Sequence, residues 1–178
     1  MHLTAKEKSW LPWFGSNGKF SLGYSCLVNR STYHAVEQTF EGIASTRVKI
    51  LQLWTLNQWD HLNSLANLLD LQTLENNQPL LVKKLAAAPD FSEIFIVDTQ
   101  GQVVCSTYSQ RVGYKHSQQK ALYKGLEHKF LHGPYQDADT LKIGPSTSKF
   151  HDEVTLMFYL PVQINQDEKI VICGRVPN

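Results

Sequence analysis

Apolar residues recur at helical spacing between residues 31 and 70. They are separated by three residues, four residues or sums of these, at Val36, Phe40, Ile43, Leu51, Trp54, Leu62, Leu65 and Leu69. Ser31 or Thr32 can cap the start of this helix. The pattern predicts one long helix over roughly residues 32–70, which at 1.5 Å per residue would be about 58 Å long. Because this exceeds the width of a domain of this size, we expect the helix to overhang or to stack on a neighbour.

The segments on either side of this helix have a different pattern. Residues 1–30 contain one proline and three glycines that interrupt every periodic run, so we interpret them as a leader segment. Its Trp10, Trp13 and Phe14 either dock on the domain or a partner, or belong to a partly ordered terminus. Leu71 to Gln78 break the long helix, and Pro79 suits the first turn of a second, short helix that ends before Pro89.

After Asp90 the period becomes that of β-strands. The run EIFIVD, the turn Thr99–Gln102 and the run VVCSTYS predict a hairpin. A helix is expected around Ser117–Phe130 and a loop over LHGPYQDADT, followed by strands at Leu141–Ile143, Val154–Ile164 and Lys169–Val176. The short polar turn NQDE should pair the last two strands antiparallel. The predicted class is α+β, with a long N-terminal helix and a five-stranded antiparallel sheet.

Composition narrows the possible functions. The chain has 178 residues, 42% of them hydrophobic, which is typical of one globular domain. Seventeen basic and sixteen acidic residues leave a net charge of +1, and no basic cluster is longer than Lys83-Lys84, so no nucleic-acid partner is expected. The longest apolar stretch, Val154–Val162, is far shorter than the roughly 20 residues of a bilayer-spanning helix, and no signal pattern opens the sequence.

Motifs for metal binding and catalysis are weak in this sequence. Cys26, Cys105 and Cys173 lack CxxC spacing, and their odd number fits either redox compartment. His128 and His132 have the i, i+4 spacing of helical metal ligands, with His116 upstream, but no glutamate lies between them and Gly133-Pro134 follows at once. Phosphate loops, nucleophile elbows and paired carboxylates are also missing. We therefore expect no enzyme activity, no metal and no cofactor.

Two segments resemble a known family. FSEIFIVDTQGQVVCSTYSQRVG is similar to the signature of Cache domains, the extracytoplasmic PAS-like sensor modules, in which a long N-terminal helix leads into a strand, an Asp-x-x-Gly turn and a strand ending in Ser-Thr. LHGPYQDADTLKIGPSTSKFHDEVTLMFYLPV and the closing CGRVPN resemble the first sensory module of a group of bacterial methyl-accepting chemotaxis proteins. The resemblance covers about residues 31–178.

The resemblance implies a ligand-sensing input domain. Residues 1–30 would be a leader and residues 31–178 a single Cache-type domain, with the long helix over 31–72 and a PAS-like sheet within 73–178. The helix would form a homodimer and pass the signal to a cytoplasmic signalling region outside this chain. An extracytoplasmic, periplasmic location in an inner-membrane receptor is implied, and a cytoplasmic one is the alternative. The tyrosine, arginine and tryptophan pattern of amino-acid-binding double Cache receptors is not evident.

The same resemblance places a ligand between the sheet and the connection of its second and third strands, roughly Tyr108–Thr140. Such sites combine an apolar pocket with a few polar groups. An arginine would bind a carboxylate and an aspartate an amine or hydroxyls. The candidate ligand-binding residues are Tyr108, Arg111, Tyr135, Asp137, Ser146, Ser148, His151 and Tyr159. Their alternative role is a hydrogen-bonded turn at Gly144–Ser148, with Asp137 capping its own loop.

Three other interpretations remain open. Neighbouring strand residues point to opposite faces, so His151 and Asp152 are not expected to form a catalytic dyad, and His151 would line the pocket mouth or fix the turn. Arg175 is expected to have a structural role, for instance by pairing with Asp98. The competing functions are a protein-interaction or dimerisation module without a ligand and an intracellular PAS domain that binds haem or flavin.

Overall fold

A computed structural model describes residues 18–137, 154–165 and 168–177. The chain divides into two units, Met1–Leu53 and Trp54–Asn178. The helices are α2 (Gly18–Ala66), α3 (Gln78–Ala87) and α4 (Gln119–Glu127), with 3-10 turns η2 (Leu74–Asn77) and η3 (Ser109–Arg111). The strands are β1 (Glu93–Val97), β2 (Val103–Ser106), β3 (Phe130–Gln136), β4 (Val154–Gln163) and β5 (Lys169–Pro177). In the part of the chain that is described, no helix has the length and hydropathy needed to cross a membrane.

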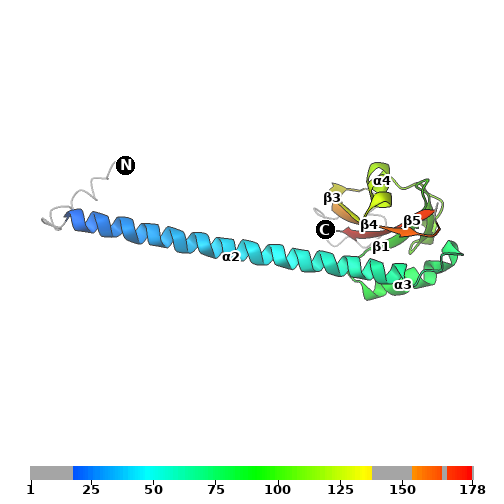
Figure 1. Ribbon diagram of the computed structural model, residues 1–178, viewed down its shortest axis with the longest axis horizontal. Helices are drawn as coiled ribbons and strands as arrows, with labels where there is room; N and C mark the ends of the chain where they lie inside the picture. The colour runs from blue at the N-terminus through cyan, green and yellow to red at the C-terminus, as the bar shows by residue number, and fades with distance from the viewer. Residues whose placement is uncertain (1–17, 138–153, 166–167, 178) are drawn as a thin grey trace. The chain divides into compact units, whose positions relative to one another are not determined.

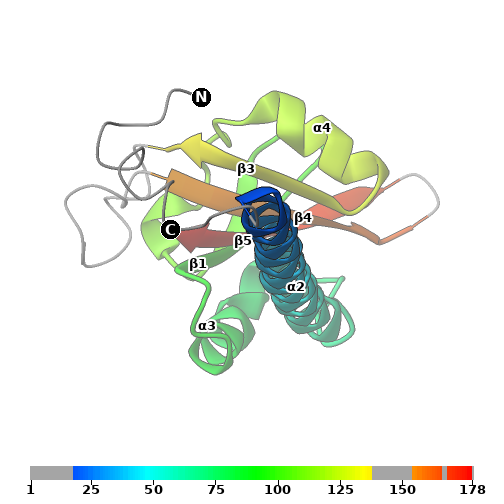
Figure 2. The same ribbon diagram turned by 90° about the vertical axis from the view of Figure 1, so that its left-hand side faces the viewer.

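The five strands form one antiparallel sheet in the order β2-β1-β5-β4-β3. Helix α4 covers one face, while α3 and the end of α2 cover the other (Figures 1 and 2). The predicted α+β class, with a long N-terminal helix and a five-stranded antiparallel sheet, is therefore confirmed. The expected hairpin between β1 and β2 and the antiparallel pair β4–β5 are also present.

Strand β1 is buried along its whole length and alternates between two apolar clusters. Ile94 and Ile96 belong to the cluster under α2 and α3, whereas Phe95 and Val97 belong to the cluster under α4. The same alternation on β5 separates Ile172 from its neighbour Cys173. The sheet therefore has two distinct buried faces, and a polar side chain on either of them needs a partner.

The last turns of α2 pack on the sheet through aromatic rings. Phe158 of β4 contacts Trp54 and Trp59 edge-on, with ring centroids 5.9 and 4.9 Å away. Asp90, just before β1, accepts hydrogen bonds from the Trp54 indole and the Gln58 amide at 2.8 and 2.7 Å. Both tryptophans are partly buried against the core, and α2 is tied to the chain that enters β1.

The long helix starts earlier than its sequence pattern suggested. We expected it near residue 32, with glycines interrupting the preceding segment, but α2 already begins at Gly18 and continues through Gly23. One glycine inside a helix costs about 1 kcal/mol relative to alanine, which a helix of 49 residues can absorb. The helix ends at Ala66, a few residues before the expected position.

The third strand is the main correction to the predicted topology. Helix α4 ends at Glu127, before the expected Phe130, and Phe130–Gln136 pairs with β4 as β3, although a loop was expected from Leu131 onward. Gly133 and Pro134 had suggested a turn, but they lie at a register shift between His132 and Tyr135 on an edge strand. Proline and bulges are tolerated at such edges because no further strand needs the missing donor. The strand predicted at Leu141–Ile143 lies outside the described residues.

Candidate functional site

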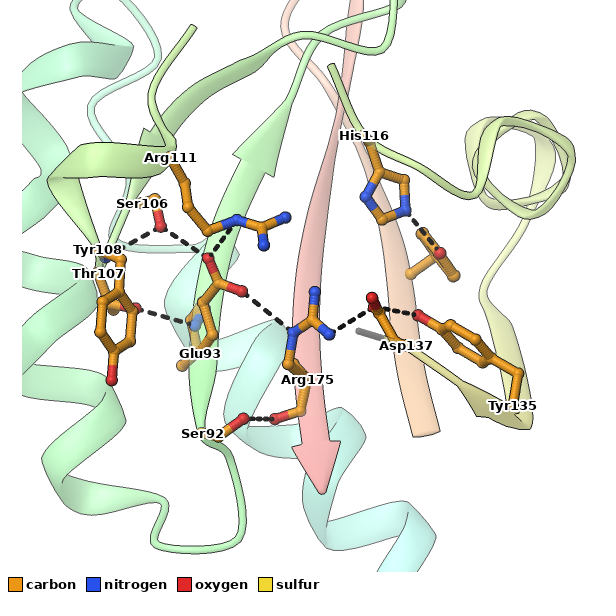
Figure 3. A network of polar contacts seen from close by, with 12 residues as sticks. Ser92, Glu93, Ser106, Thr107, Tyr108, Arg111, His116, Tyr135, Asp137 and Arg175 are labelled. Atoms are coloured by element: carbon orange, nitrogen blue, oxygen red, sulfur yellow. Dashed lines mark hydrogen bonds and ion pairs between the residues drawn. The ribbon is translucent and has the colours of Figure 1, made fainter. Parts of the chain in front are cut away.

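A charged residue from β1 faces one from β5 on the α4 face of the sheet. Glu93 is the first residue of β1, and the antiparallel register places it directly opposite Arg175 near the end of β5. Both side chains are fully buried. The Arg175 Nε donates a hydrogen bond to Glu93 Oε2 at 3.1 Å. This buried ion pair is the centre of the polar cluster in Figure 3.

Two further groups hold the other oxygen of Glu93. Arg111, from turn η3, places its Nε 3.1 Å from Glu93 Oε1, and its guanidinium lies 5.5 Å from the centre of the Phe95 ring. The Ser106 hydroxyl donates to the same carboxylate oxygen at 3.0 Å and accepts the backbone N–H of Tyr108. Arg111 is 15% exposed, so the cluster reaches solvent on this side.

Asp137 completes the cluster from the end of β3. Arg175 Nη1 donates to Asp137 Oδ2 at 2.5 Å, and the Tyr135 hydroxyl donates to the same oxygen at 3.3 Å. Figure 3 shows Arg175 between the two carboxylates, with Glu93 on one side and Asp137 on the other. The two arginines and two carboxylates balance in charge, which is the condition for burying such groups.

Burial and pairing shift the protonation of these groups. Burial raises the pKa of Glu93, and the positive charges of Arg111 and Arg175 oppose this shift only in part. Burial also works against the charged form of Arg175, but Asp137 and Glu93 outweigh it and raise its pKa. Burial raises the pKa of Tyr135 and Tyr159 as well, so both phenols stay neutral near pH 7 and can donate hydrogen bonds.

A second polar contact lies on the same face below α4. His116 Nε2 is 2.8 Å from the Tyr159 hydroxyl, and both residues are buried. Helix α4 approaches the sheet closely here, because a Cβ atom at Gly125 would lie only 2.5 Å from Tyr159 Cβ. The face under α4 therefore combines apolar packing with hydroxyl, imidazole, carboxylate and guanidinium groups.

The structure brings half of the predicted ligand-binding residues to this face. Arg111, Tyr135 and Asp137 belong to the charged cluster, and Tyr159 belongs to the adjacent apolar cluster. Tyr108, two residues after Ser106, lies at the rim and is 36% exposed. The other candidates, Ser146, Ser148 and His151, lie outside the described residues, as does Asp152.

Sequence reasoning missed the centre of the cluster. Glu93 was not a candidate, although a glutamate at the start of a fully buried strand is a signal that a cation must lie nearby. The suggested pairing of Arg175 with Asp98 is wrong. Antiparallel pairing places the end of β5 beside the start of β1, whereas Asp98 follows the other end and accepts backbone N–H groups from Gln100 and Gln102.

The structure also places the histidines and cysteines singled out in the sequence. His128 follows the end of α4 and His132 lies on β3, so the two do not share a helix face. Within the described ranges, no three acidic, histidine or cysteine side chains are arranged to hold a metal ion. Cys105 and Cys173 are free and buried, and they belong to clusters on opposite faces of the sheet, which rules out a disulfide between them.

Comparisons with known proteins give little further information. No protein-family model and no curated protein matches the chain. Among solved structures, the fold is similar to the "extracellular domain of the putative histidine kinase rpHK1S-Z16", with 12% sequence identity and a TM-score of 0.43. The match covers 56% of this chain and 39% of that chain. A similarity this distant carries no argument about function.

Proposed function

We propose that this chain is the non-enzymatic, ligand-sensing input domain of a bacterial chemotaxis receptor. It binds a small molecule outside the cytoplasm and passes the signal through its long helix to a cytoplasmic signalling region. The observation that carries the proposal is the charged cluster under the β2–β3 connection, where Arg111 is partly exposed and its guanidinium lies over the Phe95 ring. A few charged groups on an otherwise apolar face are what a small polar ligand requires.

The cluster is also connected to the long helix by short segments of chain. Glu93 lies three residues after Asp90, whose carboxylate accepts hydrogen bonds from Trp54 and Gln58 of α2. Ser92, between them, donates its backbone N–H to the carbonyl of Arg175 at 2.8 Å. A ligand that engages Arg111 and moves the start of β1 therefore acts on α2 through Asp90. A ligand that binds one of two conformations more tightly than the other shifts the equilibrium between them.

The ligand prediction is tested with a panel of amino acids, carboxylates, purines and polyamines. A ligand of the folded form at 100 times its dissociation constant should stabilise the protein by about 2.7 kcal/mol, which a thermal-shift assay detects. Calorimetry should then show binding that is about tenfold weaker or worse in Arg111→Lys and Tyr108→Ala. The control Lys120→Gln, on the exposed side of α4, should bind as the wild type does. Equal affinity in all four proteins would place the ligand elsewhere.

We also propose that the chain forms a homodimer through α2. Tyr33, Val36, Phe40, Ile43 and Ile50 follow one another at intervals of three, four, three and seven residues, which is the heptad spacing of a coiled coil. Each is between 46% and 75% exposed. The same exposed stripe supports the alternative function, a dimerisation or protein-interaction module that has no small-molecule ligand.

The dimer proposal predicts a position-specific effect of charge. Ile43→Glu should weaken the dimer at least about tenfold in sedimentation equilibrium, because it places two carboxylates in the apolar seam. Val48 is a matched control, since it is 53% exposed on the same helix but lies about 140° around the axis from Ile43. Val48→Glu should leave the dimer intact. A wild-type protein that remains monomeric at all concentrations would contradict the proposal.

A further inference from the structure

A cleft lies on the other side of the sheet from the charged cluster. It has a volume of about 810 Å³, within the range of small-molecule sites, and is bordered by the turn after α2, by strand β2 and by Ile164, Asn165 and Glu168. Its apolar wall consists of Leu71, Leu74, Val104 and Ile164, all of which pack against the core under α2 and α3. The cleft therefore has an ordered apolar floor of its own.

The charged side chains among the described lining residues of this cleft are all acidic. Glu75 lines it from η2 and Glu168 from the position just before β5, and both are exposed. The described lining contains no lysine and no arginine. Two carboxylates beside an apolar floor favour a cation that also has hydrocarbon to bury.

Side-chain hydrogen bonds hold the turn that forms one wall. Asp70 accepts hydrogen bonds from the Gln72 backbone N–H and the Thr73 hydroxyl. The Asn77 side chain is 4% exposed, accepts the backbone N–H of Asp70 and donates to the carbonyls of Asp70, Thr73 and Leu74. Such preorganisation lowers the entropic cost of binding.

We propose that this cleft binds a small organic amine, a short methylene chain with one or two ammonium groups. The methylenes would lie on Leu71, Leu74 and Ile164, and the ammonium groups would pair with Glu75 and Glu168. A bare divalent cation fits less well, because such ions need six or more oxygen ligands and the described residues contain no cluster of three ligating side chains. The site is independent of the sensor proposal, which concerns the opposite face of the sheet.

The test uses putrescine as probe and butane-1,4-diol as its uncharged analogue. Calorimetry on the whole chain should show saturable putrescine binding that weakens with added salt and no binding of the diol. The double variant Glu75→Gln/Glu168→Gln should bind at least about tenfold more weakly, because both carboxylates are lost. Glu127→Gln, on the exposed side of α4, is the matched control and should bind normally.

Three outcomes would overturn this inference. The first is no saturable binding of putrescine at millimolar concentration, and the second is equal binding of putrescine and the diol. The third is binding that the double variant leaves unchanged. Because both substitutions are isosteric and exposed, the melting temperature of the double variant should match that of the wild type, which separates lost binding from unfolding. Binding lost in Arg111→Lys but not in the double variant would assign the amine to the charged cluster instead.

Discussion

Replacing Arg175 with methionine is expected to lower the free energy of unfolding by roughly 3–5 kcal/mol, the usual cost of breaking a buried ion pair by removing one partner. Arg175 is fully buried between Glu93 and Asp137, so both carboxylates lose their shared cation. In a thermal melt the midpoint should fall by roughly 10 °C. Urea denaturation at pH 7 measures the change in free energy directly.

The pH dependence distinguishes this mechanism from a simple packing defect. Burial already raises the pKa of Glu93, and losing Arg175 removes one of the charges that oppose this shift. A carboxyl whose pKa is higher in the folded than in the unfolded state contributes to stability while it is protonated. This contribution is complete below the unfolded pKa, about 4.3, and is lost as the pH rises through the folded pKa. The loss of unfolding free energy in Arg175→Met, relative to the wild type, should therefore be largest at and above neutral pH and become smaller toward pH 5.

Two controls accompany the Arg175 variant. Lys83→Met removes an exposed cation from α3 and should change stability by no more than about 0.5 kcal/mol. Glu93→Gln combined with Arg175→Met should cost less than the two single changes added together, because each removes a charge that the other leaves unpaired. Two results would contradict a coupled charged cluster. One is a loss of unfolding free energy in Arg175→Met that does not vary with pH, and the other is a loss in the double variant equal to the sum of the two single losses.

Truncating Phe158 to alanine should produce an effect of similar size on the opposite face. Phe158 is fully buried and contacts Trp54, Trp59 and Phe91 edge-on, so its loss leaves a cavity between α2 and the sheet. Such truncations cost roughly 3–5 kcal/mol. The tryptophan emission spectrum should shift as well, because the rings that α2 packs on the sheet lose their partner.

Met157 provides the control for this prediction. It neighbours Phe158 on β4 but belongs to the cluster under α4. Met157→Leu is a swap of similar volume that should cost less than about 1.5 kcal/mol and leave the tryptophan spectrum unchanged. If Phe158→Ala changed neither stability nor emission, the packing of α2 on the sheet would not depend on these rings.

Elements with local signals were predictable from the sequence. The β1–β2 hairpin has its turn at Asp98, whose carboxylate accepts two backbone N–H groups, and Gly101 has a φ of 82° that glycine adopts freely. The β4–β5 pair is joined by a short polar turn between two apolar runs. Strand β3 was missed because its own sequence contains Gly133-Pro134, and its pairing with β4 is a long-range interaction.

The site was predictable only in part for the same reason. Arg111, Tyr135 and Asp137 were found because they lie in one connection of the chain. The pair of Glu93 and Arg175 joins residues 82 positions apart, and only the strand order and register bring them together. A sequence pattern can suggest that a buried glutamate needs a cation, but it cannot say which arginine supplies the charge.

The most direct test of the sensor proposal is hydrogen exchange with and without a ligand found in the screen. The account predicts added protection of backbone amides at residues 106–116, which carry Arg111 and Tyr108, and altered exchange at residues 54–58, where α2 meets Asp90. Protection at the first segment together with a change at the second would support ligand sensing that is coupled to the long helix. Protection confined to other segments, or no change at residues 54–58 at saturating ligand, would contradict it.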